Sequence, residues 1–341
     1  MEYRKLGNSG AIVTAYCLGT MTFGKESDEA TSFEIMNNFV EAGGNFLDTA
    51  DVYSDGTSEE IVGRWLKGKK QRDLVIATKG RFPMGDGPNH LGLSRKHLAE
   101  ALDASLRRLG VEQIDLYQMH AWDALTPLDE TLRFLDDSIR NGKIAYYGFS
   151  NFLGWHVTKA VWLAKLNHYQ PPVTLQPQYN LLVRDIEHEV IPACQDAGMG
   201  LLPWSPLAGG WLSGKYKRDQ MPTGATRLGE NPNRGMEAFE SRNAEERTWQ
   251  VISAVQDVAE ARGISMAQVA LAWTAQRPAV TSVIIGVRTV EQLRYNLGAA
   301  SLVLDPAEME KLDSVSAPRV SDYPYGVGGN RQRHRKMEGG R

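Results

Sequence analysis

The alternation of short apolar runs with amphipathic segments constrains the fold of this chain more than any other feature. Eight runs have the length and composition of buried strands. They lie at residues 16–19, 45–48, 74–77, 114–119, 144–149, 173–176, 200–203 and 282–285. Eight strands that alternate with helices over 341 residues favour an α/β fold, a parallel (β/α)8 TIM barrel, over an open, doubly wound sheet.

Helices are expected between these strands, where apolar residues recur at helical spacing and polar caps or glycines mark the ends. They are predicted at residues 28–40, 58–66, 94–109, 128–139, 152–167, 186–197, 244–262, 265–276 and 290–297. Residues 1–14 alternate around a turn-forming cluster and predict an N-terminal hairpin. No linker with a shift in composition divides the chain, so a single domain over residues 1–341 is expected.

Two segments fall outside the alternation. Residues 205–243 are rich in Gly, Pro, Arg and Asn and show little periodicity, which predicts a long loop after the seventh strand. Such a loop in a compact domain is either disordered or a functional lid, and its position after a strand end favours the lid. The C-terminal tail, residues 318–341, shows no helix pattern and is a candidate to fold over the same end of the barrel.

The composition excludes some classes of function. With 42% hydrophobic and 23% charged residues, the chain is typical of a soluble globular protein, and its net charge of −3 argues against a nucleic-acid binder. The basic run at residues 331–336 is interpreted as a solvated tail. Cys17 and Cys194 are expected to be free thiols in a reducing compartment. No leader and no apolar run of membrane-spanning length is found, so a cytoplasmic protein without membrane partners is expected.

Reactive side chains lie at three successive strand ends. Asp48, Lys79 and His120 are expected to end strands two, three and four on one rim, and Tyr53 enters from the loop after Asp48. A phenol is a poor acid at neutral pH. A nearby ammonium stabilises the phenolate and is expected to lower the phenol pKa, while an aspartate fixes the lysine. Histidine can orient a carbonyl oxygen or share the proton. The set suits carbonyl reduction, where hydride reaches carbon and a proton reaches oxygen.

Each of these residues also has a purely structural interpretation. A buried Asp and Lys often form a structural ion pair, and a lone Tyr or His is often a packing residue. Four such groups on successive strand ends of one face favour the functional interpretation. A metal-dependent hydrolase is a weaker alternative, because the seven histidines show no metal-ligand spacing and Glu187-His188-Glu189 is expected to begin a helix that faces solvent.

Several motifs resemble the aldo-keto reductase superfamily. They are Leu18 to Met21, Asp48 with Tyr53, Ala77 to Gly80, Gln118 to Asp123 and Gly286 to Leu293. The resemblance covers nearly the whole chain. Within the family, the chain is similar to the longer bacterial and channel-β-subunit-like branch. It implies a barrel plugged at its bottom by the hairpin, with Tyr53 as general acid and Asp48, Lys79 and His120 as its partners. It also implies extended NADPH without the usual dinucleotide fold, and no G-x-G-x-x-G motif follows the first strand.

The resemblance also implies a set of cofactor-binding residues. Ser150, Asn151 and Gln176 would bind the carboxamide, Trp204 would stack on the nicotinamide, and residues 205–243 would clamp the pyrophosphate. Arg288 would bind the 2'-phosphate through two hydrogen bonds of its guanidinium, which favours NADPH as the cofactor. NADH is a possible second cofactor. The full set is Gly19, Thr20, Met21, Asp48, Ser150, Asn151, Gln176, Trp204, Ser205, Leu207, Gly209, Gly210, Lys215, Gly286, Arg288, Gln292 and Asn296.

The expected function is therefore reversible, NADPH-dependent reduction of an aldehyde or ketone. The substrate is expected to meet Tyr53, His120, Phe23 and Trp122, and Met21, Phe152 and Trp155 could also line an apolar funnel. In the family, a change at the His120 position goes with double-bond reduction instead. A cofactor-binding regulatory or sensor subunit with little turnover is the alternative. Both a monomer and a homo-oligomer are compatible with the sequence.

Overall fold

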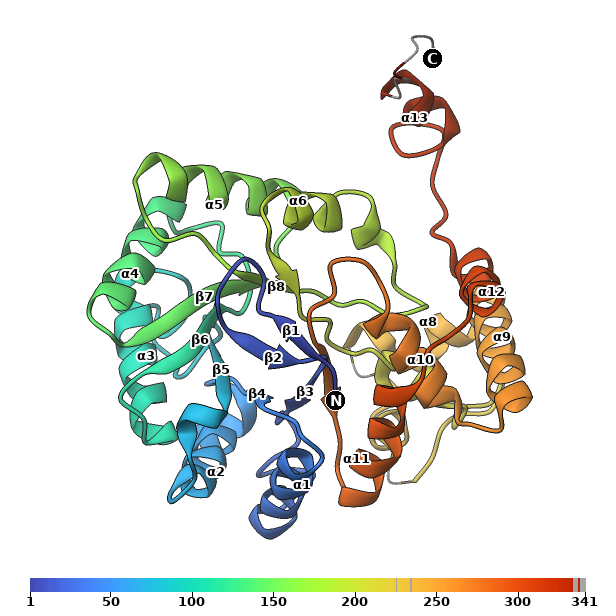
Figure 1. Cartoon of the computed structure of the whole chain (residues 1–341), viewed down its shortest axis with the longest axis horizontal. Helices are drawn as coiled ribbons and strands as arrows, with labels where there is room; N and C mark the ends of the chain where they lie inside the picture. Colours follow the sequence, from blue (N-terminus) through green and yellow to red (C-terminus); the bar gives the residue numbers. More distant parts are fainter. Residues whose placement is uncertain (225, 234, 334–336, 338–341) are drawn as a thin grey trace.

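The strands expected from the sequence form one parallel sheet in an α/β fold. The computed structural model describes residues 1–224, 226–233, 235–333 and 337. The sheet has the order β10-β3-β4-β5-β6-β7-β8-β9 and curls on itself (Figure 1). Its strands are β3 Tyr16–Gly19, β4 Phe46–Asp48, β5 Val75–Gly80, β6 Ile114–Met119, β7 Ile144–Ser150, β8 Thr174–Gln176, β9 Gly200–Leu201 and β10 Val283–Gly286.

Backbone hydrogen bonds also join the two ends of this sheet. Leu201 N donates to Ala279 O at 2.9 Å, and Thr281 N donates to Leu201 O at 2.8 Å. Beyond β9, Ile284 N donates to Pro203 O at 3.0 Å. The last strand, β10, is therefore held both by β3 on one side and by the chain around β9 on the other.

A short hairpin lies over one end of the sheet's interior (Figure 1). Its strands, β1 Tyr3–Lys5 and β2 Ile12–Thr14, pair antiparallel. Arg4 donates to Ala275 O at 2.8 Å and to Val280 O at 3.0 Å. The hairpin's Leu6 and Val13 belong to one buried cluster with residues in or beside the strands of the sheet. These are Cys17, Phe46, Ala77, Leu116, Val173, Leu202 and Ile284.

The helices surround the sheet and bury their apolar faces against it (Figure 1). The longer ones are α1 Glu29–Glu41, α2 Thr57–Leu66, α3 Arg95–Leu109, α4 Leu128–Arg140, α5 Gly154–Leu166, α9 Glu246–Arg262, α10 Met266–Ala275, α11 Val290–Leu297 and α12 Pro306–Ser316. Their ends follow local chemistry. In α3, the Ser94 hydroxyl accepts from His97 N, and Gly110 ends the helix at a φ of 66°.

Two strands run further than the sequence suggested. β5 continues to Gly80 and β7 to Ser150, so Lys79 and Ser150 lie inside their strands and not beyond them. The cause is continued pairing with the next strand, since Lys79 pairs with Gln118 and Ser150 pairs with Gln176. The sequence pattern located the apolar part of each strand and missed its polar end.

The segment at residues 186–197 and the long loop also differ from the expectations. The first divides into a 3-10 turn, Asp185–Glu187, and a shorter helix, α6 Val190–Asp196. Glu187 does not face solvent as a helix start, because it accepts from Tyr179 OH and from Arg184. Residues 205–243 are not structureless, since they contain the 3-10 segments Ala208–Ser213 and Gly235–Glu237 and two short helices, α7 Arg227–Glu230 and α8 Phe239–Asn243.

The C-terminal region holds helices that the sequence analysis did not predict. α12 has a capping box, in which Asp305 accepts from Glu308 N and Pro306 occupies the first turn. The tail contains α13 Val327–Arg333, which lies apart from the sheet beyond α12 (Figure 1). Of the basic run 331–336, residues 334–336 lie outside the described residues.

We expect Gly63 to be required for the packing of α2 against α3. A Cβ at this position would lie 2.2 Å from Arg108 O and 2.8 Å from Leu109 O, and these backbone atoms cannot turn away. Gly63→Ala is therefore expected to lower the free energy of unfolding by about 1–3 kcal/mol, measured by urea denaturation. Gly10→Ala, which meets nothing within 4 Å, should change it by less than about 0.5 kcal/mol. Equal values for both variants would contradict the packing assignment.

Candidate active site

The structure brings Asp48, Lys79 and Tyr53 into direct contact. Asp48 ends β4, and its register partner on β5 is Ala77. Lys79 lies two residues further along β5, so its side chain projects from the same face of the sheet as Ala77. The Lys79 ammonium, Nζ, donates to Asp48 Oδ2 at 2.5 Å, to Thr49 O at 2.7 Å and to Tyr53 OH at 3.2 Å.

The carboxylate of Asp48 is held from two further strands. Its other oxygen, Oδ1, accepts from Gln176 Nε2 of β8 at 2.9 Å and from Gln118 Nε2 of β6 at 3.2 Å. Asp48 is 2% exposed and Lys79 is fully buried. A buried ion pair persists only where its remaining hydrogen-bonding positions are filled, and the two amides supply that condition here. Gln176, which is also expected to bind the nicotinamide carboxamide, uses its Nε2 to donate to Asp48.

The environment keeps Lys79 charged. Burial alone lowers the pKa of Lys79, but the Asp48 charge and the interactions with Asp48 and Tyr53 raise that pKa above its usual value. Lys79 therefore carries a positive charge at neutral pH directly beside the Tyr53 hydroxyl.

Tyr53 responds in a direction that the sequence analysis did not anticipate. Burial raises the pKa of its phenol above the ordinary value of 10.0, and Lys79 opposes this shift without reversing it. Lys79 lowers this pKa as expected, but the loss of solvent, which the sequence analysis did not consider, outweighs the lysine charge. The phenol carries its proton at neutral pH, as a proton donor must, and Lys79 is placed to stabilise the phenolate once the proton has left.

His120 lies on the other side of the tyrosine. It follows β6, and its ring meets the Tyr53 ring edge to face at 5.8 Å between centroids and the Phe82 ring at 4.6 Å. Burial, together with the charges of Lys79 and Arg81, lowers the pKa of His120 well below its usual value. The imidazole is neutral at pH 7 and offers one N–H to a partner. Within the described residues, its Nδ1 has no hydrogen-bond partner.

The polar residues after β7 lie beside this group. Asn151 Nδ2 donates to His120 O at 2.9 Å, and its Oδ1 accepts from Trp204 Nε1 at 3.1 Å. The Ser150 hydroxyl donates to Gln176 O at 2.8 Å. On the opposite side, Gly19 and Gly286 are register partners at the ends of β3 and β10. These expected cofactor residues therefore end strands of the same sheet edge as Asp48.

Cationic side chains gather where the cofactor phosphates were expected. Burial lowers the pKa of Lys215, and the nearby Arg288 and Arg227 lower it further. The adjoining Gly209 and Gly210 have φ values of 65° and 103°. A Cβ at Gly210 would lie 2.1 Å from Lys215 Cε. Clustered cations beside a glycine backbone suit phosphate oxygens, so this donor set fits the pyrophosphate and 2'-phosphate of the expected cofactor.

Arg288 is held by acidic residues in this structure. Its guanidinium forms a two-pronged pair with Glu230 of α7, at 2.7 and 3.0 Å, and lies 3.6 Å from Glu26. The Gln292 side chain accepts from Arg288 N at 2.8 Å. Asn296, expected in the adenine pocket, is 7% exposed. A phosphate that binds Arg288 must therefore compete with the carboxylate of Glu230.

Aromatic side chains form the rim beyond His120. Trp122 stacks on His156 with 3.9 Å between ring centroids, and it meets the edges of Phe152 and Trp155 at 5.3 and 5.5 Å. Phe23, expected to meet the substrate, is fully buried in the hydrophobic core. We correct that assignment to packing: Phe23 O accepts from the Ser54 hydroxyl at 2.9 Å, which supports the turn that carries Tyr53.

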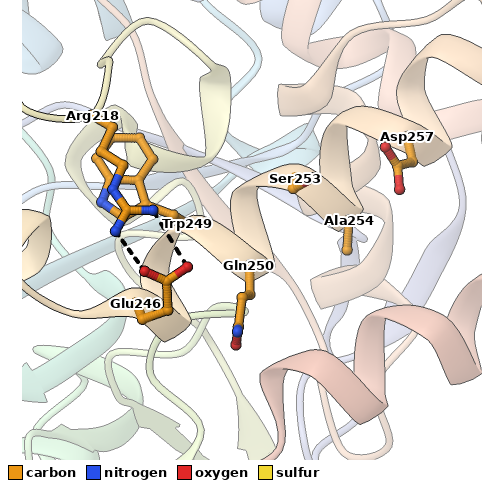
Figure 2. Close-up of a pocket in the computed structure, with 7 residues that line it drawn as sticks. All are labelled: Arg218, Glu246, Trp249, Gln250, Ser253, Ala254 and Asp257. Atoms are coloured by element: carbon orange, nitrogen blue, oxygen red, sulfur yellow. Dashed lines mark hydrogen bonds and ion pairs between the residues drawn. The ribbon is translucent and has the colours of Figure 1, made fainter.

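Other features of the molecule lie away from this group. A groove of about 440 Å³ lies along α9, and none of the expected site residues line it. Figure 2 shows residues that line it, among them Trp249 and the ion pair of Arg218 and Glu246. Among the described residues, no group of three His, Cys, Asp or Glu side chains could hold a metal ion. No helix in that part of the chain is long and apolar enough to cross a membrane.

Comparison with known protein families matches this chain to one family. The model of the Aldo/keto reductase family matches residues 15–317. The chain belongs to this family. It is an NAD(P)H-dependent oxidoreductase, as its motifs suggested.

Three relatives illustrate the range of proteins that this family member resembles. An uncharacterized oxidoreductase of Bacillus subtilis is 39% identical, and the alignment covers 92% of this chain and 96% of the relative. A probable voltage-gated potassium channel subunit beta of rice is 36% identical, and the alignment covers 92% of this chain and 96% of the relative. An aryl-alcohol dehydrogenase [NADP(+)] of Phanerodontia chrysosporium is 33% identical over 91% and 80%.

Some residues of the site escaped the sequence analysis. Gln118 was quoted only as part of a motif, although it lies two residues before His120 in β6 and faces the same interior. A polar residue at an inward strand position was the available signal. Phe82, two residues after β5, and Asp51, between Asp48 and Tyr53, carried no such signal, because loop conformation decides where their side chains point.

We expect His120 to stay neutral across the physiological range, because its burial and the adjacent Lys79 depress its pKa. The imidazole NMR signals of His120, assigned by comparison with His120→Gln, should not shift between about pH 6 and 8, which spans the unperturbed histidine pKa of about 6.5. A titration midpoint near that unperturbed value would contradict the assignment and would place a cation where we expect a neutral hydrogen-bond donor.

Proposed function

We propose that this oxidoreductase reduces an aldehyde or ketone to the alcohol, reversibly, with NADPH as the cofactor and Tyr53 as the proton donor. One observation carries the proposal: a buried, charged lysine contacts both a carboxylate and a protonated phenol, with Lys79 Nζ 2.5 Å from Asp48 Oδ2 and 3.2 Å from Tyr53 OH. A phenol next to a fixed ammonium is a competent acid for an oxygen that gains negative charge.

The roles of the side chains follow from their charge states. When bound, NADPH supplies the hydride to the carbonyl carbon. The Tyr53 hydroxyl transfers its proton to the carbonyl oxygen, and Lys79 stabilises the phenolate that remains. Neutral His120 cannot act as a strong acid at pH 7, so it donates a hydrogen bond that orients the carbonyl. Asp48 holds Lys79 in place. In the direction of alcohol oxidation, the phenolate takes the proton back.

The choice of NADPH rests on the cationic cluster. Lys215, Arg227 and Arg288 lie close enough to depress the pKa of the lysine, which suits an additional phosphate. One relative is named as an NADP(+) enzyme. We propose Gly19, Thr20, Met21, Ser150, Asn151 and Trp204 for the nicotinamide side, and the glycine segment with Arg288, Gln292 and Asn296 for the phosphate and adenosine side. NADH remains a possible second cofactor.

The same proposal covers the architecture around the site. We assign residues 1–341 to one domain, a closed (β/α)8 barrel whose bottom the hairpin covers, and residues 205–243 to a cofactor clamp. The hydrogen bonds that join β9 to the chain before β10 support the closure. Cys17 and Cys194 are both buried free thiols in the described structure, which supports a reducing compartment such as the cytoplasm.

A regulatory or sensor subunit is the second candidate, because one relative is named as a potassium channel subunit beta. The two candidates differ in turnover. Consumption of NADPH with a generic aldehyde would support the reductase. A protein that binds NADPH and turns over no carbonyl compound in a broad screen would favour the sensor.

We expect Tyr53→Phe to abolish carbonyl reduction with little effect on NADPH affinity. The variant loses the transferable proton and keeps the ring, and loss of a general acid costs about 10²–10⁴-fold in rate. The measurement is kcat for a generic aldehyde, together with NADPH affinity from tryptophan fluorescence. Tyr3→Phe, on the exposed hairpin, should retain full activity. Survival of most of the turnover in Tyr53→Phe would show that the acid lies elsewhere.

We expect Arg288→Ala to weaken NADPH binding by about 1.5–3 kcal/mol, or roughly 10- to 100-fold, because a hydrogen bond to a charged group is lost. NADH lacks the 2'-phosphate, so its affinity should change little. Arg294→Ala is a control on α11, the helix that begins two residues after Arg288, where the Arg294 guanidinium binds Asn38. Equal losses for the two cofactors in Arg288→Ala would remove the proposed 2'-phosphate contact.

A further inference from the structure

A buried carboxyl group lies in the loop between two residues of the candidate active site. Asp51 is fully buried, and it sits in the loop between Asp48 and Tyr53. Within the described residues, neither of its carboxyl oxygens accepts a hydrogen bond of regular geometry, and only the adjacent Val52 N–H lies near enough to lower the pKa of Asp51 as a donor would. A buried carboxyl group without partners is costly, so its retention requires either ordered water or a role in the site.

Two other polar groups near Asp51 share this condition. Tyr117 OH and Arg108 Nη2 are also buried and, in the described part of the chain, without hydrogen-bond partners. Asp51 and Tyr117 converge over Gly80, where an added Cβ would lie 3.5 Å from Asp51 Oδ2 and 2.3 Å from Tyr117 OH. Buried donors and acceptors that lie near one another without direct hydrogen bonds are often bridged by ordered water.

The loop that carries Asp51 forms hydrogen bonds with both the backbone and the side chain of Lys79. Asp51 N donates to Lys79 O at 3.1 Å, and Tyr53 N donates to Ala50 O at 3.2 Å. Lys79 Nζ donates in turn to Thr49 O at 2.7 Å. Asp51 is thus part of the same short turn that presents the Tyr53 hydroxyl to the ammonium.

Charged groups face Asp51 from each element packed around it. They are Glu59 on α2, Arg108 on α3 and Lys79 on β5, and the neutral phenol of Tyr117 faces it from β6. Glu59 is itself fixed, because it accepts from Thr78 Oγ1 at 2.5 Å and from Arg108 Nε at 2.7 Å. Burial and then Glu59 raise the pKa of Asp51 to about 7, and the negative charge of Asp51 raises the pKa of Tyr53.

We propose that Asp51 is a positioning residue of the proton donor: it holds ordered water with Tyr117 and Arg108, and its charge sets how readily Tyr53 releases a proton. This inference rests on the proposed function. When Asp51 is ionised, its charge opposes the stabilisation of the Tyr53 phenolate by Lys79. When Asp51 is protonated, Lys79 acts on the phenol alone and proton donation is easier.

The first test compares the pH dependence of kcat/KM for carbonyl reduction in the wild type and in Asp51→Asn. The wild-type value should fall as the pH rises through about 7, by roughly two- to tenfold, since one pKa unit corresponds to a tenfold change. Asp51→Asn fixes a neutral side chain of the same shape and should remove this fall. Retention of an unchanged inflection in the variant would overturn the proposal.

A second variant guards against a loss of folding in the first. Glu59→Gln removes the neighbouring charge that raises the Asp51 pKa, so the inflection should move to lower pH and not disappear. Asp136→Asn is the matched control. Asp136 lies on the outer helix α4 and is also buried, but its carboxylate accepts hydrogen bonds from Arg140 and from Gln170 N. Its profile should overlay that of the wild type. An unmoved inflection in Glu59→Gln would contradict the proposed charge coupling.

A spectroscopic measurement separates this inference from the proposed function. Phenolate absorbance is titrated at alkaline pH as the difference between each protein and its Tyr53→Phe counterpart, which requires no turnover. Asp51→Asn should lower the Tyr53 midpoint relative to the wild type. Coincident midpoints would overturn the inference even in an active enzyme, whereas a lowered midpoint in a protein without carbonyl turnover would support the inference and refute the reductase.

Discussion

The buried ion pair between Lys79 and Asp48 is the interaction on which the rest of the site depends. It links adjacent strands, and the amides of Gln118 and Gln176 extend it to two more. Removing either charge would leave the other buried and unpaired, a loss of about 3–5 kcal/mol. The parallel sheet makes the arrangement possible, because side chains from separate strands meet at one edge without help from flexible loops.

The same buried environment leaves two groups neutral and one charged around this pair. Burial drives His120 to its neutral form and keeps the phenol of Tyr53 protonated, while Lys79 stays charged because Asp48 compensates its loss of water. In the proposed reaction, these would serve as the proton donor, the orienting group and the fixed cation for a carbonyl oxygen. The chemistry therefore depends on which group has a charged partner and not on the residue types alone.

The sequence located most of the architecture and the principal side chains, because both depend on patterns that are local in the chain. The apolar runs predicted the strands, and the helix at residues 290–297 agrees at both ends. Features set by tertiary contacts were missed. The second partner of Asp48, Gln118, comes from another strand, and the pKa direction of Tyr53 depends on burial that a motif does not encode. The helix α12 was missed, although its capping residues were visible in the sequence.

The N-terminal hairpin has a consequence for how the chain reaches its native state. Leu6 and Val13 complete the inner cluster, and Arg4 binds the carbonyls of Ala275 and Val280. Residues 4–13 thus pack against residues 275–284, which are synthesised about 270 residues later in the chain. Such long sequence separations slow folding. The nascent chain must wait with an unfinished interior, so chaperone demand during synthesis should fall on the period before residues 279–286 emerge.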